Sequence, residues 1–286
     1  MKIDQKQQQQ KPSLLVMQNR PKIMIPSSPP PQKQQNNFLF TTKQQKTKTC
    51  CQQSVNEMSF QAQKPKKWSP TQQQLLAKRS VVVDGITVFI EQDIVANQDG
   101  EANVNRGRPD VCEVGKVLWP GSVFLIEYLN FITKDWDSVD VLELGCGPGL
   151  VGIYLGLRGA KCVLTDLDNV VELAQRNVEH NFKDIESRSS YGLAPTVVCY
   201  DWNAEEADIS QDLRKSFDFI VASEVLYEKC NFEALLQVID RHSTDTTRVY
   251  MSYQIRTGGE FEYCKETLSA LGFSVGLVES DQLPPR

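Results

Sequence analysis

The 286-residue sequence contains no apolar run that approaches the roughly 20 residues of a membrane-spanning helix, and none that resembles a signal-peptide core. It has only two histidines, and its eight cysteines form no C-x-x-C pair, so no zinc-binding cluster is visible. Several cysteines fall in expected core strands, which suits a reducing compartment. These absences predict a cytoplasmic protein without a membrane segment and without a metal.

The first 70 residues contain few acidic side chains. Asp4 and Glu57 are the only acids there, against twelve of the 31 lysines and arginines, so the rest of the chain carries 19 basic and 34 acidic residues. Glutamine and proline runs interrupt this stretch, which cannot bury enough apolar area to offset its chain entropy. We therefore predict a disordered Gln/Lys/Pro-rich extension over residues 1–75 and a folded domain over residues 76–286.

A basic, acid-poor N-terminus is also typical of an organelle transit peptide. The extension, however, has a single arginine (Arg20), few serines before residue 50 and no regular amphipathic period. The alternative is a solvated tail that touches acidic surfaces or RNA without specificity, so no specific nucleic-acid partner is expected.

The pattern of apolar residues after position 80 predicts an α/β fold. Residues 81–90 are two β-rich runs joined by Asp84-Gly85, a strong signal for a type I′ hairpin. An apolar helix is expected near residues 122–132. Strands and helices then alternate, which predicts a mostly parallel sheet covered on both faces. The strands are expected near 140–145, 161–166, 195–200, 217–222, 247–253 and 273–279, and the helices near 149–158, 169–181, 231–242 and 260–271.

A glycine-rich turn follows the first of these strands. Gly145, Gly147 and Gly149 let the backbone turn sharply and lie flat against a ligand, since a Cβ would obstruct it. Asp166 stands at the end of the next strand, 21 residues after Gly145, where a carboxylate can accept both hydroxyls of a ribose. Asp168 competes weakly for that role, because its position better suits the start of the next helix. A cofactor that bears adenosine is the leading interpretation.

The turn does not carry the dinucleotide fingerprint G-x-G-x-x-G, because position 150 is Leu150. A nicotinamide oxidoreductase is therefore the least favoured function. The turn has the form E-L-G-C-G-P-G from Glu143, which resembles the first motif of class I, seven-strand S-adenosylmethionine-dependent methyltransferases. Cys146 could be imagined as a nucleophile, but no histidine neighbours it in sequence, and the resemblance makes it a backbone contact.

Three further motifs narrow the resemblance. Trp119 precedes the first helix, Asp201-Trp202 follows the third strand, and Glu224 and Tyr227 form an E-x-x-Y motif after the fourth. Together they resemble the methyltransferase-like 21 type of protein-lysine methyltransferase over about residues 80–280. The resemblance implies a Rossmann-like seven-strand sandwich and S-adenosylmethionine as the cofactor. It also implies cofactor contacts from seven residues: Trp119, Gly145, Cys146, Gly147, Asp166, Trp202 and Ala222.

Glu224 and Tyr227 are the candidates for catalysis on the substrate side. A free lysine has a pKa of about 10.4, so a neutral amine at pH 7 costs about 3.4 units, or roughly 4.6 kcal/mol. A carboxylate raises the pKa of a lysine while aromatic burial lowers it. We therefore assign Glu224 first to binding and orienting the ammonium, with proton acceptance as a second role. Tyr227 would shape the channel and present its ring or hydroxyl to the amine.

The resemblance implies a protein substrate such as a chaperone, an AAA-type ATPase or a translation factor. The protein is expected to be a monomer. Two alternatives stay open: the same cofactor with a histidine, arginine or small-molecule acceptor, and a catalytically silent binding module. The acidic run Glu205, Glu206 and Asp208 is expected to be a solvated loop, although it could attract a basic substrate surface.

The expected strands number one fewer than the fold needs. The seven-strand fold closes with an antiparallel strand inserted between the two preceding strands, and no strand is expected after residues 273–279. The sequence therefore predicts that the last strand is missing, as in a truncated chain or a divergent end, which would leave an exposed sheet edge. The N-terminal extension is expected to be dispensable for cofactor binding.

Overall fold

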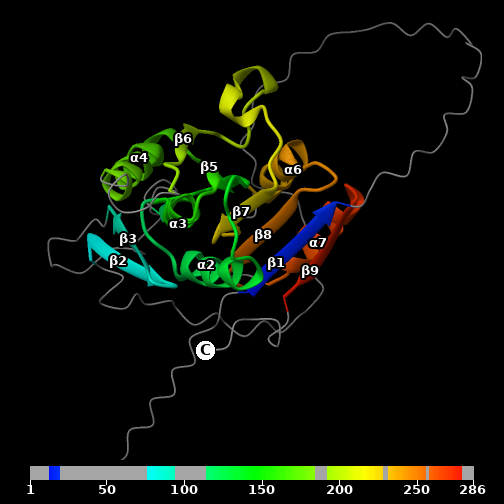
Figure 1. The fold of residues 1–286 in the computed structure, drawn as a ribbon. Helices are drawn as coiled ribbons and strands as arrows, with labels where there is room; N and C mark the ends of the chain where they lie inside the picture. Colours follow the sequence, from blue (N-terminus) through cyan, green and yellow to red (C-terminus); the bar gives the residue numbers. More distant parts are fainter. Residues whose placement is uncertain are drawn as a thin grey trace, which may run out of the picture. The chain divides into compact units, whose positions relative to one another are not determined.

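The computed structural model describes residues 13–19, 76–93, 114–183, 192–227, 231–255 and 258–278. All of these residues belong to one compact unit, which comprises Met1–Pro21 and Pro65–Arg286. Within it, a seven-stranded sheet has the order β6-β5-β4-β7-β8-β1-β9, and a separate hairpin pairs β2 with β3 (Figure 1). The fold is therefore a mixed α/β sheet, as the sequence predicts.

Six of the seven strands of the main sheet, β4 to β9, fall close to the predicted ranges. Neighbouring pairs β6-β5, β5-β4, β4-β7 and β7-β8 are parallel, and the helices between them return the chain to the same edge. The strand bounds are β1 Ser13–Asn19, β4 Asp140–Leu144, β5 Lys161–Asp166, β6 Thr196–Cys199, β7 Phe219–Ser223, β8 Arg248–Tyr253 and β9 Phe273–Leu277.

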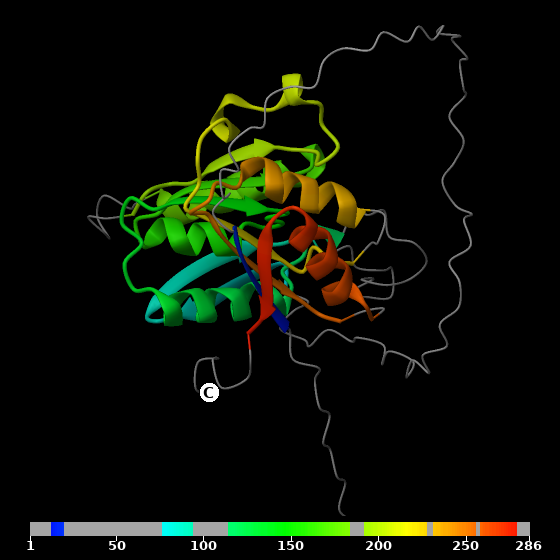
Figure 2. The ribbon, with the colours of Figure 1, turned by 90° about the vertical axis from the view of Figure 1, so that its right-hand side faces the viewer.

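Helices cover both faces of the sheet. One core cluster joins α2, α3 and α4 to the hairpin, and the other joins α6 and α7 to the opposite face. Figure 2 shows α2 and α7 on opposite sides of β1 and β9. The helix bounds are α2 Pro120–Ile132, α3 Leu150–Leu157, α4 Asp168–Phe182, α6 Phe232–His242 and α7 Glu260–Ala270.

The strand β1 corrects two predictions. It pairs antiparallel with both β8 and β9, so it occupies the position of the strand that was predicted to be missing (Figure 1). Residues 13–19 are also not part of a disordered extension, whereas residues 1–12 and 20–75 lie outside the described residues. The short apolar run lies in glutamine- and lysine-rich surroundings, and the composition of those surroundings favoured disorder over a strand.

Burial explains why β1 lies inside the sheet, between β8 and the edge strand β9. Leu14 contributes to the core cluster of α2 and α3, while Leu15 and Met17 contribute to the cluster of α6 and α7. All three side chains are at most 1% exposed. A strand that is buried on both faces reads as a continuous apolar run rather than as an alternation, which fits the segment Ser13–Asn19.

The predicted hairpin is confirmed. It consists of β2 (Lys78–Val83) and β3 (Ile86–Glu91), and the two turn residues have positive φ angles, 47° at Asp84 and 77° at Gly85. Positive φ at both central positions is the requirement of a type I′ turn. The loop predicted over residues 94–110 lies outside the described residues.

Two asparagines of α4 hold the hairpin against the main domain. Asn177 accepts a hydrogen bond from the Glu91 backbone N–H (2.8 Å) and donates to the Glu91 carbonyl (2.9 Å). Asn181, one helical turn later, makes the same pair of bonds with Phe89, at 2.9 and 2.7 Å. These amides continue the hydrogen-bonding pattern of a strand along β3. Asn177 also donates to the Pro148 carbonyl (2.9 Å), so the hairpin, α4 and the glycine-rich turn form one unit.

No helix within the described ranges is both long and apolar enough to cross a membrane.

Candidate active site

The predicted site residues gather at the carboxyl edge of the parallel strands. β4 lies at the point where the strand order reverses, with β5 and β6 on one side and β7 and β8 on the other (Figure 1). Gly145 follows β4, Asp166 ends β5, Trp202 follows β6 and Glu224 follows β7. Ligands of open α/β sheets bind at such a reversal, outside the carboxyl ends of the strands.

The glycine-rich turn leaves no room for side chains. Gly145, Gly147 and Gly149 have positive φ angles of 64°, 54° and 87°. A Cβ at position 145 would lie 2.8 Å from Cγ1 of Val225 and 3.5 Å from Cζ2 of Trp202. At position 147 it would lie 2.8 Å from a backbone oxygen of Gly115. The turn therefore keeps bare backbone against these protein neighbours.

Asp166 is directed at this turn. Its Oδ2 accepts a hydrogen bond from the Gly147 N–H and its Oδ1 accepts one from the Leu167 N–H, both at 2.8 Å. Burial raises the pKa of this carboxyl to about 6, although the hydrogen bonds from the two N–H groups act in the opposite direction. Asp166 is therefore mostly ionised at neutral pH. Asp168 is exposed and is the first residue of α4, which is the position expected for it.

Glu143 is a buried acid whose contacts were not predicted. Its side chain is 1% exposed, and its Oε2 accepts a hydrogen bond from the Gly152 N–H at 2.8 Å. Burial raises its pKa to about 8, with the charge of Asp166 acting in the same direction and the Gly152 bond opposing it. At neutral pH this carboxyl is therefore mostly protonated. It fastens the start of α3 to β4, directly beneath the glycine-rich turn.

Cys146 sits inside the turn, where its thiol is 6% exposed and its N–H bonds to the Thr165 carbonyl (2.9 Å). Burial raises the pKa of this thiol well above its ordinary value, with Asp166 and Glu143 adding to the effect. Because a nucleophilic cysteine needs its thiolate, this environment opposes that role.

The two tryptophans of the predicted site have different neighbours. The Trp202 ring packs beside Gly145, where a Cβ would lie 3.5 Å from its Cζ2. Trp119 is the residue that precedes α2, and its indole N–H donates to the Val114 carbonyl (3.1 Å). Ala222, which is 1% exposed, pairs with Leu144 across β7 and β4, so the ends of these two strands lie side by side.

Glu224 has an unusual backbone conformation and a defined seat. Its φ angle is 58°, a left-handed conformation that is uncommon for a residue with a Cβ, and such strain often marks functional sites. Its side chain is 5% exposed. Its N–H donates to the Ser252 carbonyl (2.8 Å), and its Oε2 accepts from the Gln254 N–H (3.2 Å).

Gly121 completes this seat. A Cβ at position 121 would lie 2.4 Å from Oε1 of Glu224, so the carboxylate rests against bare backbone in the first turn of α2. Ser252 fixes the same turn, since its Oγ donates to the Gly121 carbonyl at 2.8 Å. The N-terminal end of a helix favours a negative charge. We name Gly121, Ser252 and Gln254 the Glu224 seat.

Sequence reasoning missed the Glu224 seat because its members come from α2 and β8, far apart along the chain. Only the glycine directly after Trp119-Pro120 could have drawn attention to it. Tyr227 lies in the turn after β7, three residues beyond Glu224, and is half-buried.

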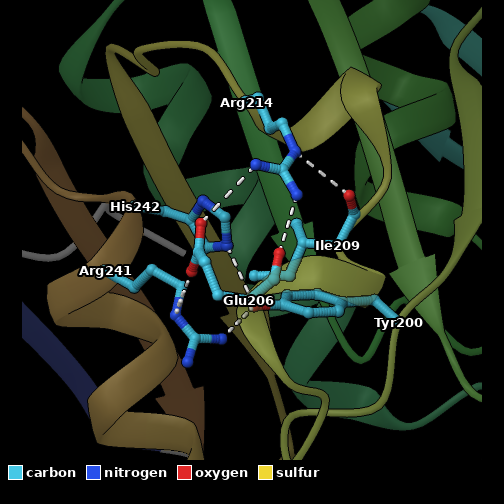
Figure 3. A network of polar contacts seen from close by, with 6 residues as sticks. All are labelled: Tyr200, Glu206, Ile209, Arg214, Arg241 and His242. Carbon is cyan, nitrogen blue, oxygen red and sulfur yellow. Dashed lines mark hydrogen bonds and ion pairs between the residues drawn. The ribbon is translucent and has the colours of Figure 1, made fainter.

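A polar network around Tyr200, which precedes Trp202 by two residues, was also missed (Figure 3). The Tyr200 hydroxyl accepts a hydrogen bond from Nη1 of Arg241 (3.1 Å) and lies 3.0 Å from Nε2 of His242. Burial, and then the charge of Arg241, lower the pKa of His242 to about 4. The histidine is therefore neutral at pH 7 and shares one hydrogen bond with the Tyr200 hydroxyl.

Glu206 links this network to the next loop. Its carboxylate pairs with Arg241 (3.6 Å) and with Arg214 (3.8 Å). Arg214 also donates to the backbone carbonyls of Glu206 (2.7 Å) and Ile209 (3.2 Å). Glu205, Glu206 and Asp208 are exposed, as predicted, and the segment also forms two short 3-10 helices, Glu206–Asp208 and Gln211–Leu213. The network fixes both ends of the segment that carries Trp202.

No group of three or more His, Cys, Asp or Glu side chains in the described ranges could hold a metal ion.

Residues 105–270 match a protein family described as lysine methyltransferases. The chain is 32% identical over 143 residues to the protein N-lysine methyltransferase METTL21A of Danio rerio, covering 50% of this chain and 62% of that protein. It is 32% identical over 168 residues to a histidine protein methyltransferase 1 homolog of Dictyostelium discoideum, covering 57% of this chain and 51% of that protein. It is 27% identical over 143 residues to the EEF1A lysine methyltransferase 3 of Xenopus tropicalis, covering 50% of this chain and 59% of that protein. The chain thus spans about half to three fifths of these relatives.

Among solved structures, the 16S rRNA N2 G1207 methyltransferase RsmC of T. Thermophilus matches with a TM-score of 0.46 and 19% identity, over 74% of this chain and 53% of that one. A magnesium protoporphyrin IX methyltransferase from Synechocystis matches with a TM-score of 0.39 and 18% identity, over 59% of this chain and 76% of that one.

Proposed function

The chain belongs to the lysine methyltransferase family, and on this premise we propose that it transfers methyl groups from S-adenosylmethionine to the side-chain amine of a lysine in a protein substrate. The observation that carries the proposal concerns Glu224. Its backbone has a positive φ, its carboxylate is held by the Glu224 seat, and it lies at the same sheet edge as the glycine-rich turn and Asp166. One carboxylate on each side of the strand reversal suits a site that must hold a cofactor and an amine together.

The residues of the turn fit an adenosyl cofactor. A Cβ at Gly145 would clash with Val225 at 2.8 Å, so only bare backbone fits beside Trp202 and would present a flat surface to the cofactor. Asp166 would accept the ribose hydroxyls with lone pairs that its two backbone bonds leave available. The Trp202 ring would offer an apolar face to the adenine, and Trp119 and Ala222 would border the ligand. Gly145, Cys146 and Gly147 would follow its methionine part. When bound, the cofactor supplies an electrophilic methyl group on a sulfonium sulfur.

Glu224 would bind and orient the substrate ammonium. The Gln254 N–H, the Ser252 carbonyl and the Gly121 backbone fix its position, so little reorganisation is needed when the amine arrives. Tyr227 would flank the amine with its ring, which attracts a cation. The amine must lose a proton before it can attack, and Glu224 or solvent would take it. Placing the nitrogen in line with the methyl group would supply most of the acceleration.

A methylation assay with labelled cofactor and cell extract tests the proposal. The parent protein should label a protein band on lysine, and Glu224→Gln, which keeps the shape of the side chain but not its charge, should lose most of this label. EEF1A, named in one relative, is the first defined substrate to test. Label that appears only in small molecules, or that is independent of Glu224, would contradict the proposal.

A histidine acceptor is the second candidate, because one relative is named a histidine protein methyltransferase. Mass spectrometry of the labelled band separates the two: methyl groups on histidine rather than lysine would replace the first proposal with the second. We also propose that the protein acts in the cytoplasm.

A further inference from the structure

A buried glutamine at the end of the hairpin holds the segment that leads into α2. Gln92 directly follows β3 and is 4% exposed. Its Oε1 accepts a hydrogen bond from the Leu118 N–H (2.9 Å), and its Nε2 donates to the Leu76 carbonyl (2.6 Å). An amide side chain has both an acceptor and donors, so a single residue can join these two backbone groups. Gln92 therefore connects the hairpin to residues 114–119, which precede α2.

Asp93 attaches the same segment one residue later. Its N–H donates to the Lys116 carbonyl (3.1 Å), and its carboxylate pairs with the Lys116 ammonium (3.4 Å). Val117 and Leu118 are both buried between these attachments and α2. The hairpin therefore fixes the centre of the segment.

Both ends of this segment reach the candidate active site. At one end, the Gly115 carbonyl oxygen would stand 2.8 Å from a Cβ at position 147, so it borders the glycine-rich turn directly. At the other end is Trp119, whose indole N–H donates to the Val114 carbonyl (3.1 Å). This bond closes the segment on itself, so a shift of its centre would move Gly115 and Trp119 together.

We propose that Gln92 is a positioning residue for the cofactor, because it holds residues 114–119 against the glycine-rich turn. Gly147, which faces Gly115, belongs to the part of the turn that would follow the methionine part of S-adenosylmethionine. The inference rests on the proposed function and gives the hairpin a role in it. The hairpin sets the wall of the site beside the methionine part, whereas Asp166 and Trp202 serve the adenosine.

The hairpin fixes the turn as well as the segment. Asn177 of α4 joins both backbone groups of Glu91 to the Pro148 carbonyl in the turn. Figure 1 shows β3 beside α4, at the side of the sheet where the turn begins α3. Glu91 and Gln92 are consecutive, so the turn and the segment are attached to the hairpin at neighbouring points. Two walls that are fixed before the ligand arrives lower the cost of ordering on binding.

Loss of the Gln92 amide should release one of these walls. Gln92→Met keeps nearly the same length and volume but offers no oxygen to the Leu118 N–H, which is buried. The cofactor would then have to order residues 114–119 when it binds. The cost should fall on ligands that carry the methionine part, because adenosine lacks the group that would meet the segment.

The test is calorimetric titration of the full chain with S-adenosylhomocysteine and with adenosine. We expect Gln92→Met to bind S-adenosylhomocysteine roughly tenfold more weakly than the parent, and adenosine within about threefold of the parent. Gln175→Met is the matched control, because it makes the same substitution at an exposed position on α4. It should leave both affinities unchanged.

Hydrogen exchange in the parent tests the same inference without a substitution, and so does not depend on how well Gln92→Met folds. S-adenosylhomocysteine should slow amide exchange in residues 114–119, and adenosine should slow it less. The amides of the hairpin turn at Asp84-Gly85 should exchange at the same rate with and without either ligand.

Three results would overturn this inference alone. The first is a Gln92→Met protein that binds S-adenosylhomocysteine as tightly as the parent, and the second is one that loses affinity for both ligands by the same factor. The third is unchanged exchange in residues 114–119 when the parent binds S-adenosylhomocysteine. A folded parent that does not bind S-adenosylhomocysteine would overturn the proposed function and this inference together.

Discussion

The carboxylate of Glu224 rests against the backbone of Gly121, so closely that a Cβ at position 121 would stand 2.4 Å from Oε1. This contact couples the start of α2 to the residue that we propose for substrate binding. A substitution at Gly121 would therefore move the Glu224 carboxylate without changing the chemistry of the Glu224 side chain.

Gly121→Ala should therefore displace the Glu224 carboxylate and leave the cofactor turn intact. Because misplacing a reacting group by about 1 Å can cost roughly 100-fold in rate, we expect kcat to fall by that order. The affinity for S-adenosylhomocysteine should change by less than threefold. Steady-state kinetics and calorimetry measure the two effects.

Gly276→Ala is the matched control, because a Cβ at position 276 meets nothing within 4 Å. It should retain parental kcat. Parental activity in Gly121→Ala, with the protein fully folded, would show that the position of Glu224 is not important for transfer.

The Glu143 carboxyl should make stability depend on pH. Its folded-state pKa of about 8 lies above the ordinary value of 4.5, so the folded protein binds this proton more tightly than the unfolded chain. Stability should therefore fall as the pH rises from about 5 to about 8, by roughly 3 to 5 kcal/mol from this group. Glu143→Gln mimics the protonated form and should remove that loss.

Urea unfolding at pH 5 and at pH 8.5 measures this dependence. The variant should match the parent at pH 5 and exceed it at pH 8.5. Equal pH slopes for the two proteins would mean that Glu143 does not hold its proton in the fold.

The asparagine contacts of α4 should stabilise the domain. Asn177→Ala removes an amide that makes hydrogen bonds to both backbone groups of Glu91 and to Pro148, and leaves those groups without that partner. We expect a loss of about 2 to 4 kcal/mol in the free energy of unfolding. Gln175→Ala, an exposed position on the same helix, should change it by less than about 0.5 kcal/mol. Similar values for the two variants would show that the hairpin is held by other contacts.

The strand β1 should be essential to the fold. Leu15 is fully buried, so Leu15→Ala should cost about 2 to 5 kcal/mol, while Gln18→Ala, exposed on the same strand, should cost little. Chemical unfolding measures both. If Leu15→Ala were as stable as the parent, β1 would not contribute to the core.

The sequence was most informative where local chemistry decides the structure. Asp84-Gly85 predicted the hairpin because both positions need positive φ, and the spacing from Gly145 to Asp166 predicted a turn and a strand end that meet. Alternating apolar segments placed the remaining strands and helices because each of these elements has its own periodicity.

The sequence was least informative where distant segments combine. β1 precedes its sheet neighbours by more than 200 residues, and nothing in its four-residue apolar run, Leu14 to Met17, states between which strands it will lie. The Glu224 seat unites α2 with β8, and the Tyr200 network unites β6 with α6. Such contacts depend on tertiary packing, which single-sequence patterns do not contain.

Calorimetric titration with S-adenosylhomocysteine tests the central claim most directly, with the parent chain and Asp166→Ala compared at pH 7.5 and pH 5. The account predicts micromolar binding by the parent, at least a tenfold loss in Asp166→Ala, and weaker binding by the parent at pH 5, where a carboxyl with a pKa of about 6 is mostly protonated. A folded parent chain that does not bind, or equal binding by both proteins, would contradict it.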